Sequence, residues 1–319
     1  MKLDFAPMEG VTSYLYRNVH AACFPGVDRY YSPFIAPDGS GRFKGAALRD
    51  ILPENNRDVH LVPQVLCGRA EAFLAVSREL AAMGYREMNL NAGCPSGTVV
   101  PKHKGAGMLA DLESLDAFLA EVFSRCELKV SVKTRLGLES TAEFPAILEI
   151  YNRYPISELI IHARDRAGMY KSAPDLAAFA GAFSGSRASV TYNGSVVDTS
   201  SLERVLAVAP ALDRVMLGRG AVTDPALFRI LRGGEALKRE ELHEFLSRLK
   251  RAFLAAGLGE HYTVSRLKEV WYYAIDKFPG AARLHKAINK ARSLEDYDAA
   301  VSALFASGLY DPAAAFQGR

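Results

Sequence analysis

Residues 87–96 read Glu87-Met88-Asn89-Leu90-Asn91-Ala92-Gly93-Cys94-Pro95-Ser96. The first five residues are typical of a buried strand, and a loop rich in Gly and Pro follows at once. The loop carries Cys94 three residues after the amide side chain of Asn91. A cysteine in such a loop is not expected to fill a core, because its thiol lies where it can give a proton to a molecule bound above it.

The same unit, a short strand followed by a loop and a helix, recurs on both sides of this segment. Eight alternations of this kind predict an α/β fold, a (β/α)₈ TIM barrel. A doubly wound open sheet is the alternative, but no Gly-x-Gly-x-x-Gly sequence opens a first helix. The expected strands are Leu3–Ala6, Arg29–Ile35, His60–Leu66, Glu87–Asn91, Lys129–Lys133, Glu158–His162, Ser189–Tyr192 and Arg214–Leu217, and the clearest helices are Ala70–Met83, Leu112–Ser124, Phe144–Tyr154 and Ser200–Ala207.

The pattern changes after Pro225-Ala226-Leu227-Phe228. Gly233-Gly234 marks a linker, and the sequence beyond it has helical periodicity and no convincing strand. We therefore expect a barrel domain over residues 1–233 and a C-terminal all-helical domain over residues 234–319.

The composition is that of an ordinary soluble enzyme, with 49% hydrophobic and 24% charged residues among 319. No apolar run reaches the ~18–20 residues of a membrane helix, and the start of the chain does not read as a signal peptide, so we expect a cytoplasmic protein. The four cysteines, Cys23, Cys67, Cys94 and Cys126, are too scattered for a metal site or a disulfide framework. The net charge of +3 is too small to indicate nucleic-acid binding by itself.

Unusual polar residues follow seven of the eight expected strands, at the end of a barrel where chemistry takes place. These segments are Ala6-Pro7-Met8-Glu9-Gly10, Gln64, Asn91, Lys133-Thr134-Arg135, His162-Ala163-Arg164, Asn193-Gly194-Ser195 and Gly218-Arg219-Gly220. Each could be an ordinary loop residue, but their shared register favours one large ligand site.

Several of these residues favour a phosphate-bearing ligand. Glycines in the last two turns let backbone N–H groups approach a phosphate, and Arg219 adds a forked cationic donor. Lys133 ends an apolar strand, where a cation could stabilise negative charge on a ligand ring. His162 with Arg164 is expected to contact a cofactor or substrate, and Gln64 could read a ring edge.

The chain at this point resembles the tRNA-dihydrouridine synthases, which are FMN-dependent enzymes with a (β/α)₈ barrel and a helical RNA-binding domain. The resemblance rests on residues 6–12, Gln64, residues 89–95, the segment Lys102-His103-Lys104-Gly105-Ala106-Gly107, residues 133–137, 162–164, 192–194 and 217–220, and more faintly on Arg266, Lys268, Trp271 and Tyr272. The Asn-x-Gly-Cys-Pro element is its strongest part. The chain departs from the family pattern at Glu9 and Ser195.

The resemblance implies a role for each candidate residue. Cys94 would be the catalytic proton donor. Cofactor-binding residues would be Pro7, Met8, Gln64 and Lys133 around the flavin ring, and His162, Asn193, Gly194, Ser195, Gly218 and Arg219 around the phosphate. Substrate-binding candidates are Asn91, Arg135 and Arg164. The implied reaction reduces the C5=C6 bond of specific uridines in tRNA, with NADPH as reductant.

The tail supplies the candidate RNA platform. Residues 262–292 hold seven Lys or Arg and two Asp or Glu. Arg283, Lys286 and Lys290 share one face of an expected helix, after the aromatic run Trp271-Tyr272-Tyr273, and basic residues near aromatics can bind phosphates and stack bases. The alternative is a solvated helix above core aromatics.

Two other functions stay open. A flavin-dependent barrel oxidoreductase could act on a free pyrimidine or a related small molecule, although this leaves the basic tail unexplained. A protein that binds RNA without catalysis is disfavoured by the set Cys94, Lys133 and Arg219. We expect a monomer with tRNA as its partner and without a metal.

Overall fold

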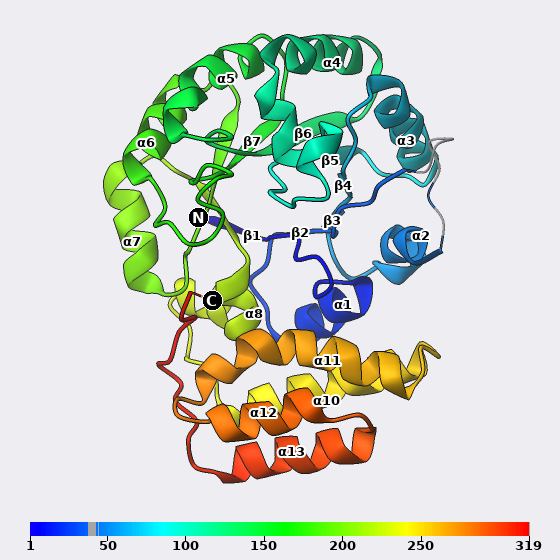
Figure 1. Cartoon of the computed structure of the whole chain (residues 1–319), viewed down its shortest axis with the longest axis vertical. Coiled ribbons are helices and arrows are strands. Elements are labelled where there is room, and N and C mark those ends of the chain that lie inside the picture. Colours follow the sequence, from blue (N-terminus) through cyan, green and yellow to red (C-terminus); the bar gives the residue numbers. More distant parts are fainter. Residues whose placement is uncertain (38–42, 44, 319) are drawn as a thin grey trace.

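A computed structural model describes residues 1–37, 43 and 45–318 of the chain. Its described strands form one parallel sheet in the order β3-β2-β1-β9-β8-β7-β6-β5-β4, which curls into a barrel (Figure 1). The strands are β1 (Lys2–Phe5), β2 (Arg29–Tyr31), β3 (Leu61–Val62), β4 (Gln64–Val65), β5 (Glu87–Ala92), β6 (Lys129–Arg135), β7 (Glu158–His162), β8 (Ser189–Asn193) and β9 (Arg214–Leu217). The predicted barrel fold is confirmed.

One predicted strand is wrong in detail. The run expected over 60–66 is broken at Pro63, so that β3 pairs with β2 and β4 pairs with β5. Proline has no N–H to donate to a ladder, which is why the strand divides there. The two pieces together take the place of one of the eight strands of the barrel, and Pro63 links the two ends of the sheet. The strand expected over 29–35 likewise ends at Tyr31, and only an isolated bridge joins Ile35 to Val65.

Helices surround the barrel in the order expected for alternating strands and helices (Figure 1). Helix α4 shows why they form, since Asp111 accepts a hydrogen bond from the N–H of Ser114 at its start, and Leu115, Phe118 and Leu119 bury one face. The helices are α1 (Tyr14–Cys23), α2 (Gly45–Ile51), α3 (Ala70–Ala82), α4 (Leu112–Arg125), α5 (Phe144–Tyr151), α6 (Leu176–Gly185), α7 (Thr199–Val208) and α8 (Arg219–Thr223).

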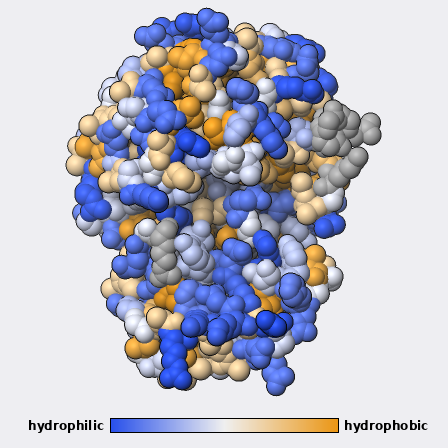
Figure 2. Space-filling model, in the orientation of Figure 1, coloured by the Kyte–Doolittle hydropathy of each residue, from blue (hydrophilic) through white to orange (hydrophobic). Residues whose placement is uncertain are grey.

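After the last strand the described chain is helical, with α9 (Leu227–Leu231), α10 (Arg239–Ala255), α11 (Glu260–Ala274), α12 (Ala282–Lys290) and α13 (Leu294–Ala306). Helix α10 packs against α1 and α11 packs against α8, so this helical region lies beside the barrel (Figure 1). Its visible face is largely hydrophilic, and a hollow separates it from the barrel in this view (Figure 2). In the described part of the chain, no helix has both the length and the apolar character to cross a bilayer.

The tail aromatics do not form one surface. Trp271 is fully buried, and its indole N–H donates to the Tyr297 hydroxyl at 2.8 Å. It packs against Phe278 and Phe305 inside the helical region. The hypothesis that Trp271 stacks on RNA is therefore wrong, because no face of its ring reaches solvent. Tyr272 is 43% exposed.

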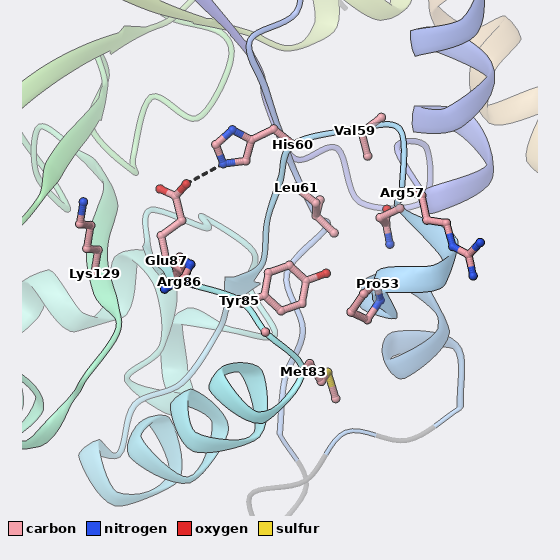
Figure 3. A pocket seen from close by; sticks show the side chains of 12 residues that line it. Pro53, Arg57, Val59, His60, Leu61, Met83, Tyr85, Arg86, Glu87 and Lys129 are labelled. Carbon is pink, nitrogen blue, oxygen red and sulfur yellow. Dashed lines mark hydrogen bonds and ion pairs between the residues drawn. The ribbon is translucent and has the colours of Figure 1, made fainter.

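A hollow of about 650 Å³ opens at the end of the barrel where the strands begin (Figure 3). It is lined by side chains around the starts of β3, β5 and β6, including Arg57, His60, Tyr85, Glu87 and Lys129. None of the predicted site residues lines it. In barrels of this kind the strand starts carry stability and the strand ends carry chemistry.

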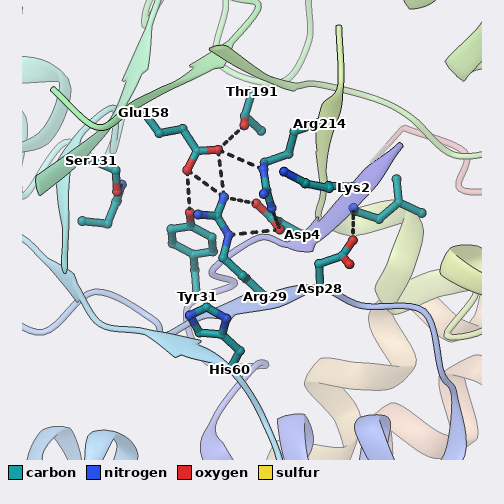
Figure 4. Close-up of polar contacts among 12 residues, drawn as sticks. Lys2, Asp4, Asp28, Arg29, Tyr31, His60, Ser131, Glu158, Thr191 and Arg214 are labelled. Carbon is teal, nitrogen blue, oxygen red and sulfur yellow. Dashed lines mark hydrogen bonds and ion pairs between the residues drawn. The ribbon is translucent and has the colours of Figure 1, made fainter. Parts of the chain in front are cut away.

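A largely buried charge cluster lies at the strand starts of the barrel, beside this hollow (Figure 4). Arg29 lies between the carboxylates of Asp4 and Glu158, at 2.6 and 2.7 Å, and Arg214 contacts Asp4 at 2.8 Å. Thr191 also donates to Glu158. Arg29, Glu158 and Arg214 are the first residues of β2, β7 and β9, and Asp4 is the third residue of β1, so their pairing holds these four strands in register.

Candidate functional site

Two adjoining cavities open at the other end of the barrel, where the strands end. We call them the arginine cavity, about 290 Å³ around Arg219, and the cysteine cavity, about 240 Å³ around Cys94. Together they reach the ~300–1,000 Å³ usual for cofactor sites. Both are lined by Pro7, Met8, Lys133, His162, Tyr170 and Tyr273. Most of the predicted site residues therefore meet at one place.

The loop after β5 holds Cys94 at the edge of the cysteine cavity. The Asn91 side-chain oxygen accepts from the N–H groups of Gly93 and Cys94, at 3.1 and 2.9 Å, and fixes the turn. Gly105 packs behind it at φ +56°, where a Cβ atom would lie 2.8 Å from the Cys94 carbonyl oxygen. Only glycine fits there. The thiol is half-buried and is free of any disulfide.

A relay of buried amides supports that loop from inside the barrel. Ser131 accepts from Asn89, whose side-chain oxygen accepts from Gln64 at 2.7 Å. The Gln64 oxygen in turn accepts from the Asn91 side-chain nitrogen at 2.8 Å. The side-chain amides of Gln64 and Asn91 each have two N–H donors, and each uses one of them in this relay. One N–H of each side chain therefore remains for a ligand in the cysteine cavity.

Lys133 projects from β6 into both cavities. Burial, followed by the positive charge of Arg135, lowers its pKa to about 7. Arg135 is itself almost fully buried and donates to the carbonyl oxygens of Gly93, Asp165 and Met169. Its guanidinium therefore ties the Cys94 loop to the loop after β7 while lining the cysteine cavity.

Arg164 lines neither cavity, but it contacts two residues that line the arginine cavity. Its guanidinium donates to His162 Nε2 at 3.0 Å and to Ser195 Oγ at 2.8 Å. Because Arg is always protonated, His162 Nε2 must accept, and the ring proton lies on Nδ1. Burial, with the nearby cations, holds the pKa of His162 well below its usual range, so the ring is neutral.

The turns after β8 and β9 line the arginine cavity. Asn193 donates to the Met216 carbonyl at 2.9 Å, which ties the two strand ends together. Among the described residues, the backbone N–H groups of Gly194, Ser195 and Gly220 have no acceptor. Backbone N–H groups gathered around a cationic cavity are suited to an anion.

Sequence reasoning missed the aromatic wall of this site. The Arg219 guanidinium lies between the rings of Tyr170 and Phe316, at 4.4 and 4.8 Å from their centroids. Tyr272 and Tyr273, expected on the RNA surface, line the arginine cavity instead. Tyr170 lies only eight residues after His162 and could have been considered, whereas nothing local in the sequence marks Phe316.

The predicted RNA-binding residues lie apart from both cavities. Arg283, Lys286 and Lys290 are exposed on α12, with the spacing of one helix face. In the described residues no group of His, Cys, Asp and Glu could hold a metal ion. The chain is thus a (β/α)₈ barrel, and the cationic and aromatic lining of the cavity at its strand ends is chemically suited to an anionic, ring-bearing ligand.

Comparison with known proteins places the chain more closely. The model of the dihydrouridine synthase (Dus) family matches residues 4–306, and the chain belongs to this family. The tRNA-dihydrouridine(16) synthase of Ralstonia nicotianae is 29% identical over 307 residues, covering 91% of each chain. A probable tRNA-dihydrouridine synthase of Staphylococcus aureus is 31% identical over 232 residues, covering 70% of this chain and 69% of its own.

Solved structures confirm the fold. A variant of NCR from Zymomonas mobilis superposes with a TM-score of 0.52 at 14% identity, covering 73% of this chain and 86% of its own. Morphinone reductase, solved with tetrahydroNAD, gives 0.51 at 13% identity over 74% of this chain and 88% of its own.

Proposed function

We propose that this protein is a tRNA-dihydrouridine synthase, an oxidoreductase that reduces the C5=C6 bond of specific uridines in tRNA with FMN and NADPH. The observation that carries the proposal is the half-buried Cys94 thiol on the wall of the cavity that also holds Lys133 and Arg135. Family membership agrees with it, and so do relatives named for this activity. We place the enzyme in the cytoplasm, as a monomer.

The cavity lining fits FMN. The unsatisfied backbone N–H groups of Gly194, Ser195 and Gly220, together with the guanidinium of Arg219, suit the FMN phosphate. The lysine between the two cavities suits the electron-rich edge of the ring, and Pro7 and Met8 offer it an apolar face. When bound, the flavin supplies the hydride that is added to C6 of the pyrimidine.

Cys94 then has one task, to deliver its thiol proton to C5. For this step the sulfur must carry its proton, so the reaction requires the thiol form and not a nucleophilic thiolate. Asn91, through its two hydrogen bonds to the loop, sets where the sulfur lies. The remaining amide hydrogens of Asn91 and Gln64 and the guanidinium of Arg135 are available to orient the pyrimidine. Arg164 acts through His162 and Ser195 and is a positioning residue.

A uridine in folded tRNA must leave its stack to reach this cavity, which costs a few kcal/mol. Backbone contacts elsewhere have to offset that cost. We assign them to the helical domain of residues 234–319, with the exposed cations of α12 as phosphate contacts.

Reversing two of these charges tests that assignment. We expect Arg283→Glu with Lys286→Glu to weaken tRNA binding and to lower the slope of log affinity against log salt by about 1.4–1.8, since each of the two phosphate contacts contributes ~0.7–0.9. Filter binding across a salt series measures both. Arg125→Glu with Arg153→Glu makes the same change in net charge on the exposed barrel surface and is the control. Equal effects of the two double variants would remove α12 from the RNA surface.

The low pKa of Lys133 predicts a pH dependence of FMN binding. Lys133 is charged below about pH 7 and loses its proton above it, so the cation that favours an anionic ligand is lost as pH rises. Between pH 6 and 8 the FMN affinity of the wild type should fall, by at most about tenfold per pH unit above the pKa. The control is Lys133→Met, whose FMN affinity is measured by flavin fluorescence over the same pH range. The titration of the FMN phosphate affects both proteins, but only the wild type should show the loss of affinity that comes from Lys133. If the affinity of both proteins changed with pH in the same way, Lys133 would not be the source of the pH dependence.

The rival function is reduction of a free pyrimidine. Purified protein with FMN and NADPH should form dihydrouridine in an unmodified tRNA transcript and should leave uridine unchanged at the same nucleotide concentration. Equal turnover on both would favour the small-molecule oxidoreductase.

A further inference from the structure

A third cavity of about 250 Å³ lies between the strand-end loops of the barrel and the helical region. We call it the flanking cavity. Its walls come from the β1 and β2 loops, α1, α2, α10 and α11, and they include Glu9, Ser13, Tyr14, Phe34, Arg49, Asp50, Phe253, Tyr262 and Arg266. The mechanism described above uses none of these residues. Its volume matches that of the cysteine cavity, about 240 Å³, which is proposed to take a pyrimidine.

The flanking cavity is the direct neighbour of the cysteine cavity. Glu9 and Phe34 line both of them. An RNA chain that places a uridine base in one cavity can therefore reach the other with an adjoining nucleotide. The side chain of Phe34 is half-buried between the two spaces.

The walls offer flat surfaces of the kind that bases stack on. Tyr262 on α11 is 42% exposed, and the Arg266 guanidinium lies 5.3 Å from the centroid of its ring. Tyr14 and Phe34 supply aromatic surface from the barrel side. Stacking on aromatic rings and on Arg planes is the usual way proteins hold an unpaired base.

Two polar atoms in the walls also lack partners. Ser13 Oγ and Arg266 Nε are buried and have no hydrogen-bond partner among the described residues. Arg266 is held in place by its Nη1, which donates to the Gly10 carbonyl at 3.0 Å. Buried donors without acceptors are costly in a native protein, and a ligand that accepts from them removes that cost.

The charges favour a base over a phosphate. The cavity is lined by two carboxylates, Glu9 and Asp50, and by the guanidinium groups of Arg49 and Arg266. Asp50 is already paired with Arg17 at 2.9 Å and with the N–H of Tyr14. The lining is therefore nearly balanced in charge, with largely apolar faces and a few polar edges. A nucleobase has the same character, whereas a phosphate would meet two carboxylates.

We infer that the flanking cavity receives the base of the nucleotide next to the target uridine, stacked on Tyr262 and hydrogen-bonded by Arg266. The inference rests on the proposed tRNA-dihydrouridine synthase activity and extends it, because it makes a second base part of substrate recognition.

The test is a double-mutant cycle with tRNA transcripts. The probes are the intact transcript and two transcripts with an abasic site 5′ or 3′ of the target uridine. We expect Tyr262→Ala to weaken binding of the intact tRNA by about fivefold to 150-fold, the range for loss of one stacked base. One of the two abasic transcripts should bind the wild-type protein as weakly as the intact transcript binds Tyr262→Ala. The affinity of that abasic transcript should not fall further when Tyr262 is replaced. Arg266→Gln should follow the same pattern more mildly.

Leu309→Ala, at an exposed side chain that lines none of these three cavities, is the control and should bind every transcript as the wild type does. The inference is overturned if Tyr262→Ala binds the intact transcript like the wild type, or if its loss is the same on both abasic transcripts as on intact tRNA. Wild-type protein that binds tRNA without forming dihydrouridine would instead sink the proposed activity, and the inference with it.

Discussion

Replacing Cys94 with alanine is expected to cut turnover on tRNA by about 10²–10⁴-fold, the usual contribution of a positioned general acid. The reason is local. The thiol lines the cysteine cavity, and its loop is fixed by Asn91 below and by Gly105 behind. Alanine removes the proton donor and leaves these contacts, which involve the backbone, in place. Single-turnover kinetics with flavin reduced beforehand would isolate the step.

The variant should still bind FMN with an unchanged absorption spectrum, because the residues proposed to hold the phosphate lie in the other cavity. Cys126→Ala is a suitable control. Its half-buried sulfur is at the end of α4, close to the Leu128 carbonyl oxygen. The control should turn over like the wild type. A Cys94→Ala enzyme with full turnover would take the thiol out of the mechanism.

Replacing Glu158 with alanine is expected to destabilise the fold by about 3–5 kcal/mol, the cost of breaking a buried ion pair by removing one partner. Glu158 accepts from Arg29 at 2.7 Å and from Thr191, and it lies 3.5 Å from Arg214. Without it, two largely buried guanidinium groups share the carboxylate of Asp4, and Arg29 has in addition the more distant carboxylate of Glu87 at 3.7 Å. Urea unfolding gives the change in free energy.

Glu121→Ala provides the matched comparison, because it removes a carboxylate from an exposed pair with Arg125 on α4. Pairs of this kind contribute about 0.3–0.5 kcal/mol. Glu158→Gln should fall between the two, since it keeps hydrogen-bonding capacity and loses the charge. If Glu158→Ala and Glu121→Ala cost the same, the charge cluster does not hold the strands together.

Much of the fold could be predicted because the local sequence of each barrel strand is an apolar run that ends in polar residues. Residues 158–162 and 214–217 were predicted with the bounds that the structure has. The division at Pro63 could also have been predicted, since proline cannot donate within a ladder. The partners of the two halves could not, because pairing of β3 with β2 and of β4 with β5 depends on ring closure.

The site was predictable where its residues follow strands, and hidden where they arrive from elsewhere. Lys133, His162 and Asn193 come at the ends of neighbouring strands, so they could be expected together at the same end of the barrel. Phe316 reaches the same cavity from the end of the chain, which no periodicity reveals. Trp271 was misjudged because a helical period alone does not say which face is buried, and packing against Phe278 and Phe305 buries that one.

The most direct measurement is mass spectrometry of tRNA from cells with and without this gene. If the protein reduces the C5=C6 bond of a uridine, at least one uridine in the deletion strain should be lighter by two hydrogens than in the parent, and a plasmid carrying the wild-type gene, but not the Cys94→Ala gene, should restore it. Identical tRNA masses in the two strains, at every uridine, would contradict the proposed activity.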